Sequence, residues 1–153
     1  MKKVFAINLF ILLLAAGGAV AQTKKAPVKK ASTGAAGGAS AAKPSVAKGK
    51  VVYTTYCLSC HQADGGGVPN MNPPLIKTSY VLGDKTRLIN ILLKGLNDEI
   101  EINGATYSNP MPAHDFLKDD DIANVLSFVR SSFGNKASPV TAAEVKKLRD
   151  AAK

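Results

Sequence analysis

The sequence predicts a small all-α domain with one minor hairpin in the last two thirds of a chain of 153 residues. Apolar residues recur at helical spacing in four separate stretches beyond residue 47. Nine of the 20 Lys and Arg residues, but none of the 11 Asp and Glu residues, lie in the first 50 positions. The net charge of +9 therefore belongs to the N-terminal third, which disfavours a basic nucleic-acid-binding domain and any nucleic-acid partner.

Residues 1–21 have the pattern of a secretory signal peptide. Two lysines precede an apolar run from Val4 to Ala16, and an Ala-Val-Ala triplet at 19–21 supplies the small residues that the signal peptidase requires. We predict cleavage after Ala21 and an exported, periplasmic protein. The alternative is an uncleaved membrane tether, for which an apolar stretch of about 17 residues is at the short limit.

Residues 22–47 consist almost entirely of Ala, Lys, Gly, Ser, Thr and Pro, with Val28 and Val46 as the larger apolar residues. This composition buries too little apolar surface to offset the entropy of ordering, which predicts a disordered linker. A solvated tether is the favoured interpretation. The alternative is weak contact of its lysines with an anionic membrane surface.

The first predicted helix, residues 48–56, runs up to a pair of cysteines. Its inward residues are expected to be Val51, Val52 and Tyr56, which lie at helical spacing. The next stretch, 65–75, is rich in Gly and Pro and is expected to be an ordered loop.

The second predicted helix is capped by Asp84 and ends at Gly95. Its inward face is expected to hold Leu88, Ile89, Leu92 and Leu93. Beyond it, residues 100–107 alternate around Asn103-Gly104, a pair typical of the type I′ turn of a β-hairpin.

The third predicted helix begins near Asp119, with acidic residues in its first turn, and Gly134 follows its end. It is expected to present Ile122, Val125, Leu126 and Val129 to the core. The fourth helix opens with Thr141 and Glu144 at the spacing of a capping box. We predict a compact domain over residues 48–134 and a C-terminal linker and helix over 135–153.

The reactive and metal-binding side chains are concentrated in Cys57-Leu58-Ser59-Cys60-His61. This C-x-x-C-H motif is the attachment signature of c-type haem. Two thiols three residues apart can reach the two vinyl-derived carbons on one edge of a porphyrin. The adjacent His61 then directs its imidazole at the iron. A Cys57–Cys60 disulfide is an alternative in an exported protein. A zinc site formed with His114 is another, although its ligand spacing matches no usual structural site.

Three residues are candidates for the second axial position on the iron. Met111 is favoured because prolines on both sides hold it in an extended loop that cannot join a helix. Met71 lies only ten residues after His61 and would have to wrap around the porphyrin edge. His114 would give a bis-His site of lower potential.

With these residues, the chain resembles the class I cytochrome c family from about Lys48 to Arg149. The resemblance implies a fold of short helices around one haem c, covalently attached through Cys57 and Cys60, with an additional C-terminal helix. It implies that His61 and Met111 ligate the iron, that the carbonyl of Pro73 (Pro74 in a shifted alignment) accepts a hydrogen bond from His61, and that Leu75 packs on the haem.

The resemblance also implies that the first and last helices of the domain cross, with Val51, Val52 and Tyr56 meeting the third predicted helix. Tyr107 and Arg87 are candidate partners of the haem propionates.

An iron with His on one side and Met on the other has no open position for a substrate, which predicts an electron-transfer protein and not an enzyme. We expect a periplasmic carrier between redox protein partners, namely a dehydrogenase, a reductase or an oxidase. Alternatives are a dedicated electron-transfer subunit of one oxidoreductase complex and a five-coordinate haem sensor or enzyme. Residues 51–134 carry six basic and nine acidic residues, so docking is expected to be weak and sensitive to salt.

Overall fold

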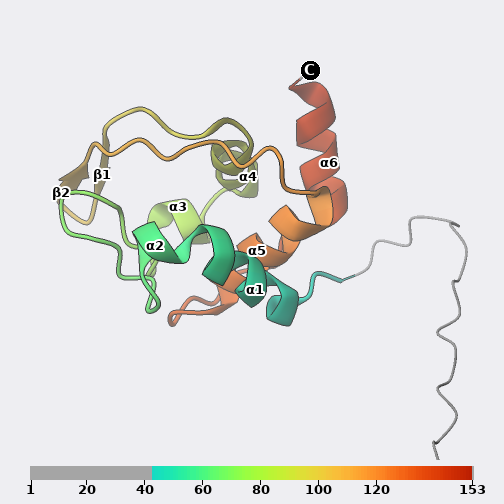
Figure 1. Ribbon diagram of the computed structural model, residues 1–153, viewed down its shortest axis with the longest axis horizontal. Helices are drawn as coiled ribbons and strands as arrows, with labels where there is room; N and C mark the ends of the chain where they lie inside the picture. Colours follow the sequence, from blue (N-terminus) through green and yellow to red (C-terminus); the bar gives the residue numbers. More distant parts are fainter. Residues whose placement is uncertain (1–42, 153) are drawn as a thin grey trace, which may run out of the picture. The chain divides into compact units, whose positions relative to one another are not determined.

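The computed structural model describes residues 43–152, so the predicted signal peptide and most of the predicted linker lie outside the described residues. Within this range the fold is mostly helical with one antiparallel hairpin (Figure 1). Its elements are α1 (Val46–Tyr56), α2 (Leu58–His61), α3 (Ser79–Leu82), α4 (Lys85–Lys94), β1 (Ile100–Ile102), β2 (Ala105–Tyr107), α5 (Asp119–Ser131) and α6 (Ala142–Ala151). Between residues 43 and 152, no helix is both long and apolar enough to cross a membrane.

Helix α1 begins at Val46, two residues before its predicted start. The Ser45 hydroxyl accepts from the Lys48 backbone N–H at the N-cap, and the Ser45 backbone N–H donates to Asn124 Oδ1 on α5 at 2.6 Å. Residues 45–47 therefore belong to the folded domain and not to the linker. The reason is a capping hydroxyl and one long-range hydrogen bond, neither of which depends on hydrophobicity.

Helices α1 and α5 cross at Gly49. A Cβ atom at this position would collide with the Asn124 carbonyl oxygen and would lie 2.8 Å from Phe128 Cβ. The predicted inward face of α1 is wrong in two of three residues, because Val51 is 66% exposed and Tyr56 is 44% exposed. The closest approach to α5 is set by the residue without a side chain, and this rotates the larger apolar residues outward.

Tyr53 is the large buried side chain that α1 contributes instead. Its ring packs against Phe128 and Phe133, with ring centroids 5.3 and 5.4 Å away. Its hydroxyl donates to the Gln62 carbonyl oxygen at 2.6 Å. Tyr53 therefore joins α5 to the residue that follows α2, and it holds the cysteine-bearing segment against the core.

The predictions for α4 and the hairpin are confirmed. The Asp84 carboxylate accepts from the backbone N–H groups of Thr86 and Arg87, and the four predicted residues of α4 are buried. Asn103 and Gly104 both have positive φ, 53° and 79°, as a type I′ turn requires. Strands β1 and β2 pair in register around this turn.

Helix α5 is the centre of the domain. Ile122, Val125, Leu126 and Val129 are buried as predicted, but every residue from Ile122 to Arg130 is buried as well. Arg130 donates to the backbone carbonyl oxygens of three residues outside α5, namely Val81, Gly83 and Ser138. Its charged group thus ties α5 to the end of α3 and to the segment before α6.

Helix α6 packs into the same hydrophobic core as the rest of the domain. Val140 and Val145 are fully buried, and the predicted capping box between Thr141 and Glu144 is present. Glu144 also forms an ion pair of 3.0 Å with Lys85 at the start of α4. The C-terminal helix is therefore a structural part of the domain.

Gly49→Ala should destabilise the protein by about 1–3 kcal/mol, because the added methyl group overpacks the α1–α5 crossing. The same substitution at an exposed helical position would stabilise it by about 1 kcal/mol. Urea unfolding of the wild type and Gly49→Ala measures the difference in their free energies of unfolding. Val51→Ala on the exposed face is the control and should change stability by less than about 0.5 kcal/mol; a larger cost for Val51→Ala than for Gly49→Ala would contradict this crossing.

Glu144→Gln should destabilise the protein by about 0.5 kcal/mol near neutral pH, since the Lys85 pair is partly exposed. Burial raises the pKa of the Glu144 carboxyl, but hydrogen bonds from Thr141 and Lys85 outweigh it and hold that pKa below 4.5. A lowered pKa in the folded state stabilises above the unfolded value, and this stability is lost as pH falls through the folded pKa.

The difference between wild type and Glu144→Gln should therefore vanish at acid pH, below the folded pKa. Urea unfolding at both pH values measures it. Glu101→Gln, at the exposed position of β1, is the control and should show no such pH dependence. If Glu144→Gln destabilises the protein as much at acid pH as at neutral pH, the Glu144 charge does not contribute to stability.

Candidate functional site

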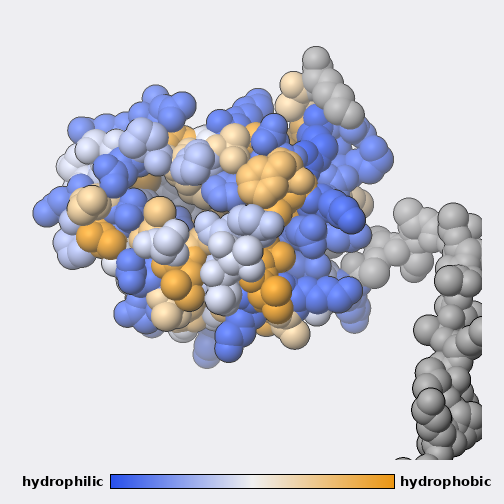
Figure 2. All heavy atoms as spheres, in the orientation of Figure 1, coloured by the Kyte–Doolittle hydropathy of each residue, from blue (hydrophilic) through white to orange (hydrophobic). Residues whose placement is uncertain are grey.

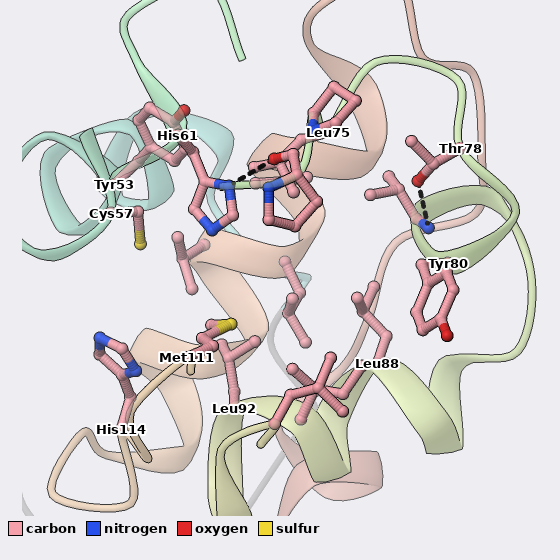
Figure 3. A pocket seen from close by; sticks show the side chains of 18 of the residues that line it. Tyr53, Cys57, His61, Leu75, Thr78, Tyr80, Leu88, Leu92, Met111 and His114 are labelled. Atoms are coloured by element: carbon pink, nitrogen blue, oxygen red, sulfur yellow. Dashed lines mark hydrogen bonds between the residues drawn. The ribbon is translucent and has the colours of Figure 1, made fainter. Parts of the chain in front are cut away.

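An apolar cavity lies between α1, α4, α5 and the loops that join them (Figure 3). A second pocket shares part of the same wall and opens toward Cys60 and Tyr107. The apolar lining of the main cavity includes Leu75, Leu88, Ile91, Leu92, Leu96, Val125, Leu126 and Val129.

His61 is the last residue of α2 and is 8% exposed. Its Nδ1 lies 3.0 Å from the carbonyl oxygen of Pro73, the contact that the resemblance implies. Because a carbonyl can only accept, Nδ1 carries the proton and Nε2 keeps its lone pair toward the cavity (Figure 3). Burial lowers the pKa of His61, against the opposing effect of the Pro73 hydrogen bond, and this favours the neutral ring.

The loop that carries Pro73 and Leu75 is held by backbone contacts. The Leu75 N–H donates to the Gly65 carbonyl oxygen at 2.7 Å, and the Leu75 carbonyl oxygen accepts from Asn135 Nδ2 at 2.9 Å. Gly67 passes so close that an added Cβ would lie 2.7 Å from the Pro73 oxygen. The acceptor for His61 is therefore fixed in place by its own loop and by the segment after α5.

The two cysteines lie at the junction of the two pockets. Cys57 lines both of them, while Cys60 is exposed and lines the second. Both are free thiols, so the disulfide alternative has no support. Burial, and then the neighbouring Cys60, raise the pKa of the Cys57 thiol to about 11, unlike the lowered pKa of a reactive redox cysteine.

The zinc alternative also lacks support. Among residues 43–152, no group of three or more His, Cys, Asp and Glu side chains is arranged to hold a metal ion.

Met111 lies in an extended loop that is anchored to the end of α4. Its backbone N–H and carbonyl pair with those of Leu96 at 2.8 and 2.9 Å. Gly95, with φ of 77°, lets this loop approach, since a Cβ there would lie 2.6 Å from the Met111 oxygen. Figure 3 shows the Met111 thioether and the His61 ring entering the cavity from different walls.

The structure separates the other two candidate axial ligands. Met71 is 51% exposed and does not line either pocket. His114 lines both, and its backbone N–H donates to the Leu92 carbonyl oxygen at 2.7 Å. Its Nδ1 lies 2.9 Å from the Pro112 oxygen, so its Nε2 is the atom left for any ligand. Met71 is thus removed from the site and His114 is not.

The two candidate propionate partners lie in different places. Tyr107 is buried and lines the second pocket. Arg87 is exposed and lies over the ring of Tyr80, 4.0 Å from its centroid. Tyr80 lines the main cavity, and sequence analysis did not select it.

The surface near the second pocket carries both acidic and apolar side chains. Asp98 lines that pocket, and Glu99 and Glu101 follow it on exposed positions. Figure 2 shows a largely hydrophilic face with several apolar side chains exposed among the hydrophilic ones. Tyr56 and Phe116 are two exposed aromatic residues, in edge-to-face contact at 5.5 Å.

Several site-forming residues were not found by sequence reasoning. Asn135 bonds three backbone groups, those of Leu75, Lys77 and Val129, and is 3% exposed. Tyr53 was missed because the predicted face of α1 was rotated. Gly95 was recognised as a helix stop, but its role beside Met111 depends on a contact between distant segments.

These features fit a covalently attached haem. The cavity is apolar; the free thiol of Cys57 lines it, and that of Cys60 lines the adjoining second pocket. A buried imidazole presents an unprotonated Nε2, and a thioether is held on another wall. This set of donors is the one that c-type haem requires.

Comparison with known proteins agrees with this geometry. The family model described as cytochrome c matches residues 46–133. The chain is 38% identical over 112 residues to cytochrome c-552 of Thermus thermophilus, covering 67% of this chain and 85% of that protein. It is 41% identical over 105 residues to the cytochrome c subunit of alcohol dehydrogenase (quinone) of Gluconacetobacter polyoxogenes, covering 67% of this chain and 22% of that subunit.

It is also 36% identical over 105 residues to the gluconate 2-dehydrogenase cytochrome c subunit of Pantoea cypripedii, covering 66% of this chain and 24% of that subunit. The family match spans more than half of the chain, and its limits enclose the C-x-x-C-H motif, the cavity and the Met111 loop. The chain therefore belongs to the cytochrome c family.

Proposed function

We propose that this chain is an exported single-electron carrier in which His61 and Met111 ligate the iron of one haem c. Cys57 and Cys60 form its thioether bonds. The observation that carries the proposal is the entry of an imidazole and a thioether into one apolar cavity from different walls, each on an anchored backbone.

As a member of the cytochrome c family, the protein carries covalent haem c and transfers electrons without catalysing a reaction itself. The haem supplies one-electron redox chemistry, and the chain's own residues supply the surroundings. His61 is held in one tautomer by Pro73, and the side chains that line the cavity are apolar. His61 and Met111 would both bind the iron, which would leave no position for a substrate.

Export to the periplasm is supported by the predicted signal peptide at 1–21. Weak contact of the linker lysines with an anionic membrane surface remains a prediction.

The second candidate is a dedicated subunit of one oxidoreductase complex. It is favoured by the relatives that are cytochrome c subunits of dehydrogenases. Purification from the native cell separates the two proposals. A fixed ratio to a catalytic subunit indicates a dedicated subunit, and recovery as a free protein indicates a carrier.

The dithionite-reduced protein should show c-type absorption bands that carbon monoxide does not change, because both axial positions are filled. Met111→Ala should bind carbon monoxide fully and should lower the reduction potential, since a thioether ligand raises it. Absorption spectra with and without the gas, together with a redox titration, measure both effects.

Two matched variants test the ligand assignment. Met71→Ala removes a methionine that does not line the site and should leave the spectrum unchanged. His114→Gln should also leave it unchanged if Met111 is the ligand. If His114→Gln binds carbon monoxide and Met111→Ala does not, the axial ligands are His61 and His114. Binding by the wild type would instead indicate a sensor or an enzyme.

Electron transfer to a cationic cobalt(III) complex should slow as ionic strength rises, because acidic residues lie beside the second pocket. Transfer to anionic ferricyanide should show the opposite trend. Stopped-flow rates from about 0.1 M ionic strength upward isolate the local field, since the Debye length there is ~10 Å.

Asp98→Asn should slow transfer to the cation about two- to fivefold. Asp120→Asn, on an exposed residue that does not line either pocket, is the control with the same charge change. Equal effects of the two variants, or rates independent of salt, would exclude charge steering at this site.

A further inference from the structure

Arg149, on the C-terminal helix, holds the far end of the loop that carries Met111. Its Nη1 donates to the Asp115 carbonyl oxygen at 2.6 Å and its Nη2 to the Leu117 carbonyl oxygen at 2.7 Å. Its Nε donates to Asp119 Oδ1 at 2.7 Å, at the first residue of α5. One guanidinium thus joins three successive points on the chain that leads from the loop into α5.

The other end of the loop is anchored independently. Met111 pairs with Leu96, and the His114 N–H donates to the Leu92 carbonyl oxygen. The loop is therefore a strap fixed to α4 at one end and to α6 at the other. At the Arg149 end, Leu117 is 7% exposed and packs in the core, while Phe116 is 63% exposed and contacts the rings of Tyr56 and His114.

An arginine is required for this contact. Its planar fork presents donors in fixed directions, so one side chain can bond three acceptors at once, whereas a lysine ammonium is a point charge on a flexible stem. The side chain is 23% exposed and the Asp119 carboxylate 29% exposed, so solvent screens the charge only in part. The helix is held in register by the buried Val145 and by the capping box at its N-terminus.

We propose that Arg149 is a positioning residue for the axial ligand: by fixing the Asp115–Asp119 end of the strap, α6 keeps the Met111 thioether on the iron. The inference rests on the proposed function, because it takes Met111 as the sixth ligand. Local opening of the strap would release the thioether without unfolding the domain. The extra C-terminal helix thus acts on the iron site through one side chain.

The test is made on the oxidised haem-loaded protein with Arg149→Leu, which removes the donors and retains an apolar stem. Cyanide can take the sixth position only when the thioether has left it, so the rate of cyanide binding measures strap opening. We expect about a tenfold faster rate, equivalent to ~1.4 kcal/mol. The iron–thioether absorption band of the oxidised protein should weaken. The cyanide-binding rate of Arg149→Lys should lie between those of the wild type and Arg149→Leu. If Arg149→Leu does not fold, Arg149→Lys is the variant for this test.

Lys85→Leu is the matched control. It breaks the ion pair that joins α6 to α4, at similar exposure, and leaves the strap and the capping box untouched. Its cyanide rate should stay at the wild-type value even where urea unfolding shows an equal loss of stability. An equal acceleration in Lys85→Leu, or none in Arg149→Leu, overturns the proposal.

Met111→Ala separates this inference from the ligand assignment. It should abolish the iron–thioether band, and adding Arg149→Leu to it should accelerate cyanide binding no further. A further acceleration means that Arg149 acts elsewhere and overturns the positioning role. A wild-type spectrum without the band overturns the ligand assignment itself, and this inference with it.

Discussion

The rest of the domain depends on the close crossing of α1 and α5 at Gly49. Without a side chain there, α1 lies against the backbone of Asn124, and Tyr53 then reaches the aromatic cluster on and after α5. The same tyrosine bonds the carbonyl of Gln62, directly after the C-x-x-C-H motif. The position of His61 is thus a consequence of how α1 and α5 pack. Gly49, which has no side chain, sets the distance between them.

Much of the cavity wall has no regular structure, and a few hydrogen bonds take its place. Asn135 joins the loop of Pro73 and Leu75 to the end of α5, and the Leu96–Met111 pair holds the second loop to α4. Side-chain amides and paired backbone groups satisfy polar atoms that would otherwise be buried alone. Loops held in this way can orient the imidazole of α2 through its acceptor and present a thioether as firmly as helices would.

This construction suits electron transfer. A carrier gains from a metal site whose geometry is the same in both oxidation states, and the anchoring of His61 and Met111, the proposed ligands, would supply it. The buried surroundings are apolar, while the charged side chains lie on the surface near the second pocket. Packing therefore shapes the cavity, and under the proposed function surface charge would act on the encounter with partners.

The sequence by itself determined the helices, their caps, the hairpin turn and the motif that binds the cofactor, because these depend on residues near one another in the chain. It did not determine the face of α1 or the roles of Gly49, Asn135 and Arg149. Each of these depends on a contact between segments far apart in sequence, and a small or polar residue carries no hydrophobic pattern that reveals its partner. Only the tertiary structure decided which residues anchor the segments that carry His61 and Met111.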